Sequence, residues 1–195
     1  MSPDMGGRLF LGVGLDAALR ERIGAQLQRQ LPEGRLPGRP IAPTLWHLTL
    51  KFLGQTDDAA ALRLTRELAT ADLGPSFMLG FSTLGAFPRP EAARLLWLGC
   101  DAGSGALAAL AAAVEAICRS LGFEAETRPF RPHLSLARLQ PARDCRALLA
   151  ALPAFEGRMR VEELRLYRSQ LGQDGPRYSV LARWPLAGEP GRSPR

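Results

Sequence analysis

The chain has few of the residues that form disulfide bonds or bind metal ions in small proteins. It holds three cysteines and two histidines in 195 residues, and Lys51 is its only lysine. Cys100, Cys118 and Cys145 are widely spaced and odd in number, which argues against a disulfide framework or a zinc site and predicts reduced, buried side chains. No apolar run reaches the about 18 residues of a membrane span. The N-terminus also lacks a basic segment followed by an apolar stretch. We therefore expect a cytoplasmic protein without membrane association.

What is present is typical of a globular protein. Hydrophobic residues make up 46% and charged residues 23% of the chain. The length fits one domain, which we place at 1–187, and the Gly, Pro, Ser and Arg residues of 188–195 predict a disordered tail. The net charge is +6, which favours anionic partners, nucleic acid first. Nothing in the sequence demands more than a monomer.

Hydrophobic periodicity predicts an α+β fold. We expect strands at about 8–15, 45–54, 77–87, 94–100, 128–138, 158–170 and 177–185, and helices at about 16–31, 57–73, 107–121 and 142–152. Strand, helix, motif strand and helix follow one another twice, which suggests an internal duplication. The expected architecture has two pseudo-symmetric lobes of mainly antiparallel sheet with outer helices, facing one another across a central cleft.

The two motif strands carry the only histidines. They read His47-Leu48-Thr49-Leu50 and His133-Leu134-Ser135-Leu136. Side chains at positions i and i+2 of a strand share a face, so each copy presents an imidazole beside a hydroxyl while its leucines turn into a core.

Two imidazoles without a third titrating partner indicate an acid–base pair that is active near neutral pH. The hydroxyls of Thr49 and Ser135 could donate hydrogen bonds to a phosphate held between the histidines. Zinc would need three or four ligands, and no Gly-x-Ser-x-Gly motif supports a serine hydrolase. The alternative without chemistry is a pair of structural histidines. The residues alone leave the roles of His47 and His133 interchangeable.

Both motif strands resemble those of the bacterial and archaeal RNA 2′,3′-cyclic phosphodiesterases of the 2H phosphoesterase superfamily, first named 2′-5′ RNA ligases. The similarity runs from about residue 8 to 186 and lies in residues 43–54 and 130–138, with further likeness at 8–13, 94–99, 166–171 and 175–178. It implies a two-lobed fold and hydrolysis of an RNA 2′,3′-cyclic phosphate to a 2′-phosphomonoester without metal or other cofactor. It further implies that His47 is the proton donor, that His133 is the proton acceptor, and that Thr49 and Ser135 bind the phosphate. Ser135 stands where threonine is commoner, and the hydroxyl is kept.

Four further residues are candidates for substrate contact. Strict alternation from the nearest histidine puts Arg131 and Lys51 on the histidine faces, whereas it puts Arg138 on the other face or at the strand end. Phe130 or Trp46 could stack a base, with core packing as the alternative.

Two other functions stay open at this point. One is ligation through a 2′-5′ linkage, which is the reverse chemistry with an RNA hydroxyl in place of water. The other is a non-catalytic module that binds RNA ends.

Overall fold

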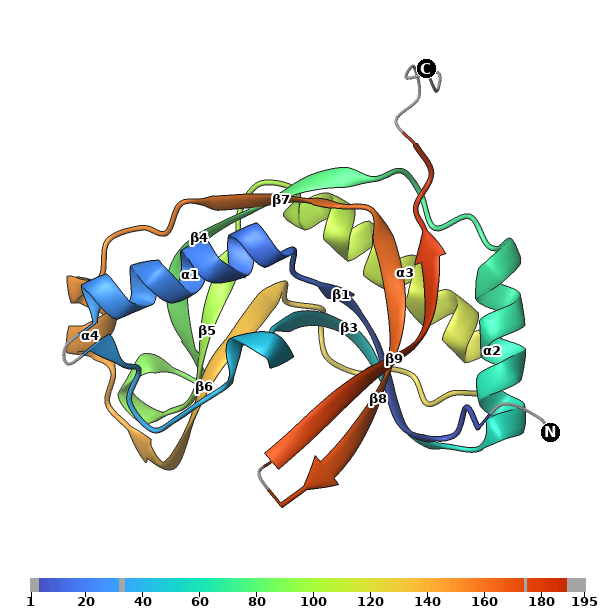
Figure 1. Ribbon diagram of the computed structural model, residues 1–195, viewed down its shortest axis with the longest axis horizontal. Helices are drawn as coiled ribbons and strands as arrows, with labels where there is room; N and C mark the ends of the chain where they lie inside the picture. The colour runs from blue at the N-terminus through green and yellow to red at the C-terminus, as the bar shows by residue number, and fades with distance from the viewer. Residues whose placement is uncertain (1–3, 32–33, 174, 189–195) are drawn as a thin grey trace.

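Two antiparallel sheets form the framework of the computed structural model, which describes residues 4–31, 34–173 and 175–188 (Figure 1). Each sheet contains one motif strand, so the predicted α+β fold with two sheets is confirmed. The first sheet has the order β3 (His47–Thr56), β1 (Gly7–Gly14), β8 (Glu163–Gly172) and β9 (Gly175–Pro185). The second has the order β2 (Arg39–Pro40), β6 (His133–Arg143), β5 (Ala93–Cys100), β4 (Phe77–Phe87) and β7 (Gly157–Val161).

The helices pack against strands of both sheets. They are α1 (Ala17–Gln30), α2 (Asp58–Thr70), α3 (Ser104–Ser120) and the short α4 (Arg146–Ala151). Asp16 and Asp57 cap α1 and α2 by accepting backbone N–H groups at 2.6 and 2.7 Å. Helix α1 follows a strand of the first sheet but contacts β7 of the second, while α3 follows β5 of the second sheet and contacts both β3 and β4. Within the described residues no helix is long and apolar enough to cross a membrane.

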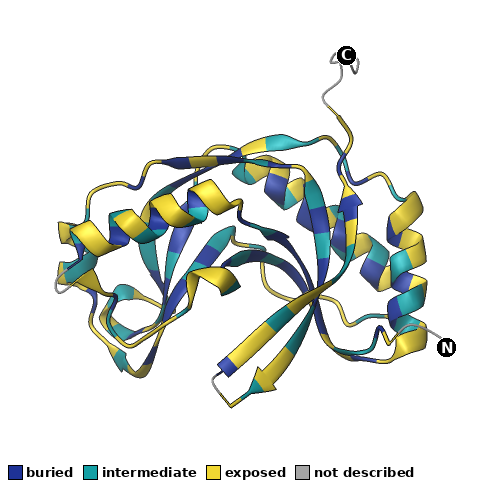
Figure 2. Cartoon of the chain, viewed as in Figure 1, coloured by how far each residue is buried: buried dark blue, intermediate teal, exposed yellow. Residues whose placement is uncertain are grey.

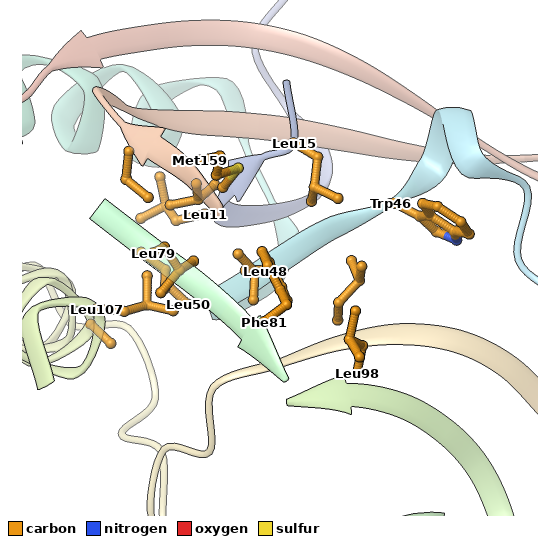
Figure 3. Close-up of a cluster of buried hydrophobic side chains, with 14 of the residues drawn as sticks. Leu11, Leu15, Trp46, Leu48, Leu50, Leu79, Phe81, Leu98, Leu107 and Met159 are labelled. Carbon is orange, nitrogen blue, oxygen red and sulfur yellow. The ribbon is translucent and has the colours of Figure 1, made fainter. Parts of the chain in front are cut away.

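One continuous core joins the two sheets. Leu11 and Leu48 from the first sheet pack with Leu79, Phe81 and Leu98 from the second (Figure 3). Figure 2 shows the same division along the helices, whose inner residues are buried and whose outer residues are exposed. The leucines of both motif strands therefore point into the core, and each histidine points to the opposite face of its sheet.

The two motif strands have similar registers with their neighbours, and the internal duplication stays a prediction. In β1–α1–β3 the histidine strand pairs with β1, and Gly14 lies opposite His47. In β5–α3–β6 the histidine strand pairs with β5, and Gly99 lies opposite His133. Both pairings have an irregularity directly after the hydroxyl residue, because Leu50 and Leu136 are each skipped in the ladder.

Some predicted boundaries are wrong for local reasons. The strand predicted at 158–170 is two strands, β7 and β8, which belong to different sheets. The break at Glu162 is where the buried residues change from odd positions, such as Val161, to even positions, such as Leu164. The second motif strand begins at His133 instead of 128, since Pro129 and Pro132 have no N–H to offer a ladder. The two-residue β2 was not predicted, and 189–195 of the predicted tail lie outside the described residues.

Candidate active site

The two motif strands lie close to one another where the sheets meet, with β3 in contact with β6. His47, Thr49, His133 and Ser135 are half-buried, whereas Leu48 and Leu134 are fully buried. The local alternation expected from the tetrapeptides is therefore present in both copies, and both imidazoles remain within reach of a ligand.

The ring of His47 is held at both nitrogens. Its Nδ1 lies 2.7 Å from the carbonyl oxygen of Leu45, and its Nε2 lies 3.0 Å from the hydroxyl of Thr49. A carbonyl oxygen can only accept, so Nδ1 carries a hydrogen. Nε2 is then the nitrogen that changes protonation, and the Thr49 hydroxyl can donate to it or accept from it.

His133 repeats the first half of this arrangement. Its Nδ1 lies 2.7 Å from the carbonyl oxygen of Arg131, again the residue two positions earlier. The same argument makes Nδ1 the donor and leaves Nε2 free for chemistry. Both rings are thus oriented by the same kind of hydrogen bond, from Nδ1 to the carbonyl two residues earlier. An acid–base pair requires rings that are oriented in this way.

Burial lowers the pKa of both histidines below its ordinary value. For His47, desolvation is the main cause, the Leu45 carbonyl opposes it, and the positive charge of His133 lowers the pKa further. For His133, desolvation again dominates and the Arg131 carbonyl opposes it. The charge of one imidazole thus reaches the other, so an anion bound between them would favour protonation of both.

Aromatic rings surround His47. Its ring centroid lies 4.7 Å from that of Phe10, 5.1 Å from that of Tyr178 and 5.8 Å from that of Tyr167. Phe10 and Tyr167 stack at 4.9 Å with their planes only 10° apart. These rings pack against the imidazole, hold it in place and exclude water from it, which accounts for its desolvation.

Gly14 makes room for polar groups beside His47. A Cβ at this position would overlap the guanidinium of Arg165 and lie 2.8 Å from the hydroxyl of Tyr167. Arg165 is also ion-paired with Glu163, which accepts from Arg183 at 2.6 Å. Any larger residue in place of Gly14 would displace this cluster from the histidine.

The surroundings of His133 combine aromatic rings with an exposed cation. Phe87 packs edge-on against the imidazole at 5.1 Å, and Trp97 lies at 6.4 Å. The guanidinium of Arg131 lies 6.0 Å from the centroid of the Phe87 ring, on an exposed side chain. The predicted place of Arg131 beside His133 agrees with this geometry, and its contact with substrate stays a prediction.

Lys51 and Trp46 are wrong as predicted substrate contacts. Lys51 is only 5% exposed, and its ammonium is bound to Glu115 at 2.8 Å and to the carbonyl of Glu124 at 2.5 Å. The skipped Leu50 shifts the alternation, so Lys51 turns away from the histidine face toward α3. Trp46 is also 5% exposed, and its indole N–H donates to the carbonyl of Ile41 (Figure 3). Phe130 is partly buried and packs against the core.

The same irregularities bring forward two residues that alternation missed. Phe52, opposite Phe10, is on the histidine face of β3 and is 65% exposed. Arg138 in β6 is displaced by the skipped Leu136 onto the face of His133 and is exposed. The sequence holds a signal for the second shift, because the buried residues of β6 change from even positions, such as Leu134, to odd positions, such as Leu139.

No group of three or more His, Cys, Asp or Glu side chains is placed to hold a metal ion in the part of the chain that the structure describes. The expectation of a metal-free reaction therefore rests on the acid–base geometry, and it stays a prediction.

Comparisons with known proteins agree on one family. The model of the 2′-5′ RNA ligase superfamily matches residues 33–173. The RNA 2′,3′-cyclic phosphodiesterase of Aeropyrum pernix is 33% identical over 80% of this chain and 91% of its own length. The protein of the same name from Escherichia coli is 32% identical over 92% of this chain and 96% of its own length.

Solved structures extend the match to three dimensions. The crystal structure of Escherichia coli LigT complexed with 3′-AMP has a TM-score of 0.79 and 31% identity, and it covers 93% of this chain and 98% of that one. TT0787 of Thermus thermophilus has a TM-score of 0.74 and 30% identity, with coverage of 93% and 99%. With paired His-x-Thr and His-x-Ser strands on a matching fold, this chain belongs to the 2′-5′ RNA ligase superfamily.

Proposed function

We propose that the protein hydrolyses RNA ends that carry a 2′,3′-cyclic phosphate and releases a 2′-phosphomonoester. The observation that carries this proposal is the pair of imidazoles, each oriented through Nδ1 by a backbone carbonyl and each beside a hydroxyl. The names of the relatives from Aeropyrum pernix and Escherichia coli support the same substrate.

In the proposed reaction, Nε2 of neutral His133 takes a proton from water, and the water oxygen bonds to phosphorus. Protonated His47 gives a proton from Nε2 to the 3′ oxygen as the bond from phosphorus to that oxygen breaks. Thr49 and Ser135 donate hydrogen bonds to the two non-bridging oxygens. The products are a 3′ hydroxyl and a 2′ phosphate, and the transferred protons return through solvent.

The division of labour between the histidines follows the family resemblance, and the differing surroundings support it. The Thr49 hydroxyl at 3.0 Å from Nε2 can accept the hydrogen of a protonated His47, which keeps the donor aimed before substrate binds. No such partner occupies Nε2 of His133 among the described residues, so its lone pair is open to water.

The decisive experiment is incubation with an RNA that ends in a 2′,3′-cyclic phosphate, followed by identification of the phosphate position. We expect only the 2′-phosphate, and equal rates with and without EDTA. A 3′-phosphate product would contradict the assignment of the leaving oxygen. Loss of activity on chelation would contradict the metal-free mechanism.

The second candidate is ligation, which the name of the matching family favours. In this reaction a 5′ hydroxyl of a second RNA replaces water. Adding a 5′-hydroxyl acceptor to the same incubation separates the two, because ligation produces a longer RNA with a 2′-5′ linkage. An RNA-end-binding module would instead retain the RNA without turnover.

A further inference from the structure

The α3–β6 segment, residues 123–132, leads into the second motif strand and has little structure of its own. It contains neither helix nor strand, most of its side chains are exposed, and it runs as an extended loop from the end of α3 to β6 (Figure 1). Its carbonyl at Arg131 is the acceptor for Nδ1 of His133. The orientation of this imidazole therefore depends on how the segment is held.

Two hydrogen bonds connect the α3–β6 segment to the elements beside it. Nζ of Lys51, on β3, donates to the carbonyl of Glu124 at 2.5 Å. The backbone N–H of Glu126 donates to Oε1 of Glu115, on α3, at 3.0 Å. The segment is thus attached both to the helix that it follows and to the first motif strand.

An ion pair joins these two attachments. Oε2 of Glu115 lies 2.8 Å from Nζ of Lys51, so both oxygens of the carboxylate are used. An ammonium group is a compact charge with donors in three directions, and it can meet a carboxylate and a carbonyl at once. Burial alone would raise the pKa of Glu115, but the hydrogen bonds from Lys51 and from the Glu126 N–H lower it below its ordinary value. The carboxylate is therefore ionised wherever the histidines titrate.

Further contacts carry this order along the α3–β6 segment toward the histidine. The carboxylate of Glu126 accepts from the N–H groups of Thr127 and Arg128 at 3.1 and 3.2 Å. Phe130 then packs against the core directly before Arg131. Because Lys51 lies four residues after His47 on β3, the ion pair fixes the entry to one histidine strand relative to the other histidine strand.

We propose that Glu115 is a positioning residue for the reaction. Through its ion pair with Lys51 and its hydrogen bond to Glu126, it holds the α3–β6 segment so that the Arg131 carbonyl keeps the imidazole of His133 aimed at the phosphate. The inference rests on the proposed function and goes beyond it, because it assigns the alignment of proton acceptor and proton donor to a side chain on α3. Glu115 acts through the backbone and needs no contact with substrate.

The test replaces Glu115 by glutamine, which keeps the size of the side chain and one acceptor oxygen but removes the charge. We expect kcat for a cyclic-ended RNA to fall by about 10–100-fold, because a misplaced catalytic group is costly. KM should change by less than about twofold, since the groups that bind substrate are untouched. Glu67→Gln is the matched control, because it makes the same chemical change at an exposed carboxylate of α2 and should keep the wild-type kcat.

A second control separates positioning from stability. Val161→Ala shortens a side chain that is 1% exposed and lies in β7, outside the elements that the ion pair joins. It should lower Tm without lowering kcat. An equal fall in kcat in Val161→Ala and Glu115→Gln, at the same loss of Tm, would overturn the positioning role.

Nitrogen NMR gives a readout that does not need activity, because the chain has only two histidines. Above the ordinary imidazole pKa of about 6.5, the nitrogen chemical shifts show which ring nitrogen carries the hydrogen. In the wild type we expect Nδ1 to carry it in both rings, since each Nδ1 faces a carbonyl. In Glu115→Gln, His133 should show a mixture of both tautomers, whereas His47 should keep its wild-type signals because the Leu45 carbonyl still holds it.

Wild-type kcat in Glu115→Gln, or signals of His133 that match the wild type, would overturn the positioning role. If the wild-type protein hydrolyses no cyclic-ended RNA, the proposed function fails. In that case the tautomer of His133, compared between the wild type and Glu115→Gln, decides the positioning role on its own.

Discussion

The two sheets use one local design in two different environments. In both, a histidine lies opposite a glycine, donates through Nδ1 to the carbonyl two residues earlier, and precedes a skipped residue in the ladder. Around His47 the neighbours are stacked aromatic rings, and the nearby arginines are neutralised by Glu163. Around His133 and along β6, Arg131, Arg138 and Arg39 have no carboxylate partner among the described residues.

The features that the two sheets share and the features in which they differ reside in different residues. The shared hydrogen bond from Nδ1 to a backbone carbonyl makes the two imidazoles nearly equivalent. It therefore does not distinguish the proton donor from the proton acceptor. Some of the side chains that differ lie on strands outside the β1–α1–β3 and β5–α3–β6 units, namely β8 and β9 in the first sheet and β2 in the second, whereas Phe10 and Arg138 lie within these units on β1 and β6.

The largest expected effect comes from removing either imidazole. His47→Ala and His133→Ala should each lower kcat by about 10²–10⁴-fold, the usual contribution of an acid or base. The double variant should be little worse than either single one, because the two act as a unit. Rate measurements with a cyclic-ended RNA and circular dichroism of each variant check this. Full activity in either single variant would contradict the two-histidine mechanism.

Removing the hydroxyls should have a smaller and more symmetric effect. Thr49→Val and Ser135→Ala each delete a hydrogen bond to a charged phosphate, which costs about 1.5–3 kcal/mol, or about 10–100-fold in kcat/KM. Ser135→Thr is the matched control and should retain activity because the hydroxyl is kept. If Ser135→Ala were fully active while Thr49→Val was not, only the first hydroxyl would hold phosphate.

Lys51 offers a test of stability instead of catalysis. Lys51→Met should lower the free energy of unfolding by about 2 kcal/mol, less than for a fully buried pair because the Glu115 side chain is 25% exposed. At about 2–4 °C per kcal/mol, Tm should fall by about 4–8 °C. Thermal unfolding checks this, with Arg66→Met as a control that should barely change Tm. A large rise in KM with an unchanged Tm would return Lys51 to the substrate.

Phe52 tests whether an exposed aromatic ring on the histidine face of β3 contacts substrate. Because it is 65% exposed, Phe52→Ala should leave Tm nearly unchanged. If the ring stacks a base, KM for a cyclic-ended RNA should rise about fivefold, from the loss of about 1 kcal/mol. Phe52→Tyr should keep the wild-type KM. An unchanged KM in Phe52→Ala would show that this ring does not stack a base.

The smallest effect concerns pH. Activity requires neutral His133 and protonated His47, so kcat/KM should rise as the first loses its proton and fall as the second does. Burial lowers the pKa of both, so the optimum of kcat/KM should lie below the ordinary imidazole value of about 6.5. Bound phosphate raises the pKa of His47, so the falling limb of kcat should lie at higher pH. An optimum above pH 7 for kcat/KM would contradict the desolvation of both rings.

Much of the fold followed from local sequence signals. Asp16 and Asp57 were readable as helix caps, and the alternation of leucines around each histidine showed which face is buried. These features depend on neighbours in the chain. The division of 157–172 between two sheets depends on which strands are free to pair, so the alternating apolar residues of 158–170 predict a single strand.

The residues of the site divide in the same way, into those that depend on neighbours in the chain and those that depend on strand pairing. His47, Thr49, His133 and Ser135 follow from a motif, since position i and position i+2 suffice to place them. Residues beyond the skipped leucines do not follow, because one extra residue reverses every later side chain. That single shift removed Lys51 from the histidine face, and the matching shift in β6 put Arg138 on it.

The crosswise helices have a consequence for the independence of the two halves. Helix α1 packs on β7 of the second sheet, and α3 packs on β3 of the first sheet as well as on β4 of the second, so the apolar surface of each sheet is covered in part by a helix that follows a strand of the other sheet. A half-length fragment would be expected to associate with another copy instead of folding alone. The distance between the two imidazoles is therefore set by the same contacts that hold the whole chain folded, and a loosened helix should be felt in catalysis before the protein unfolds.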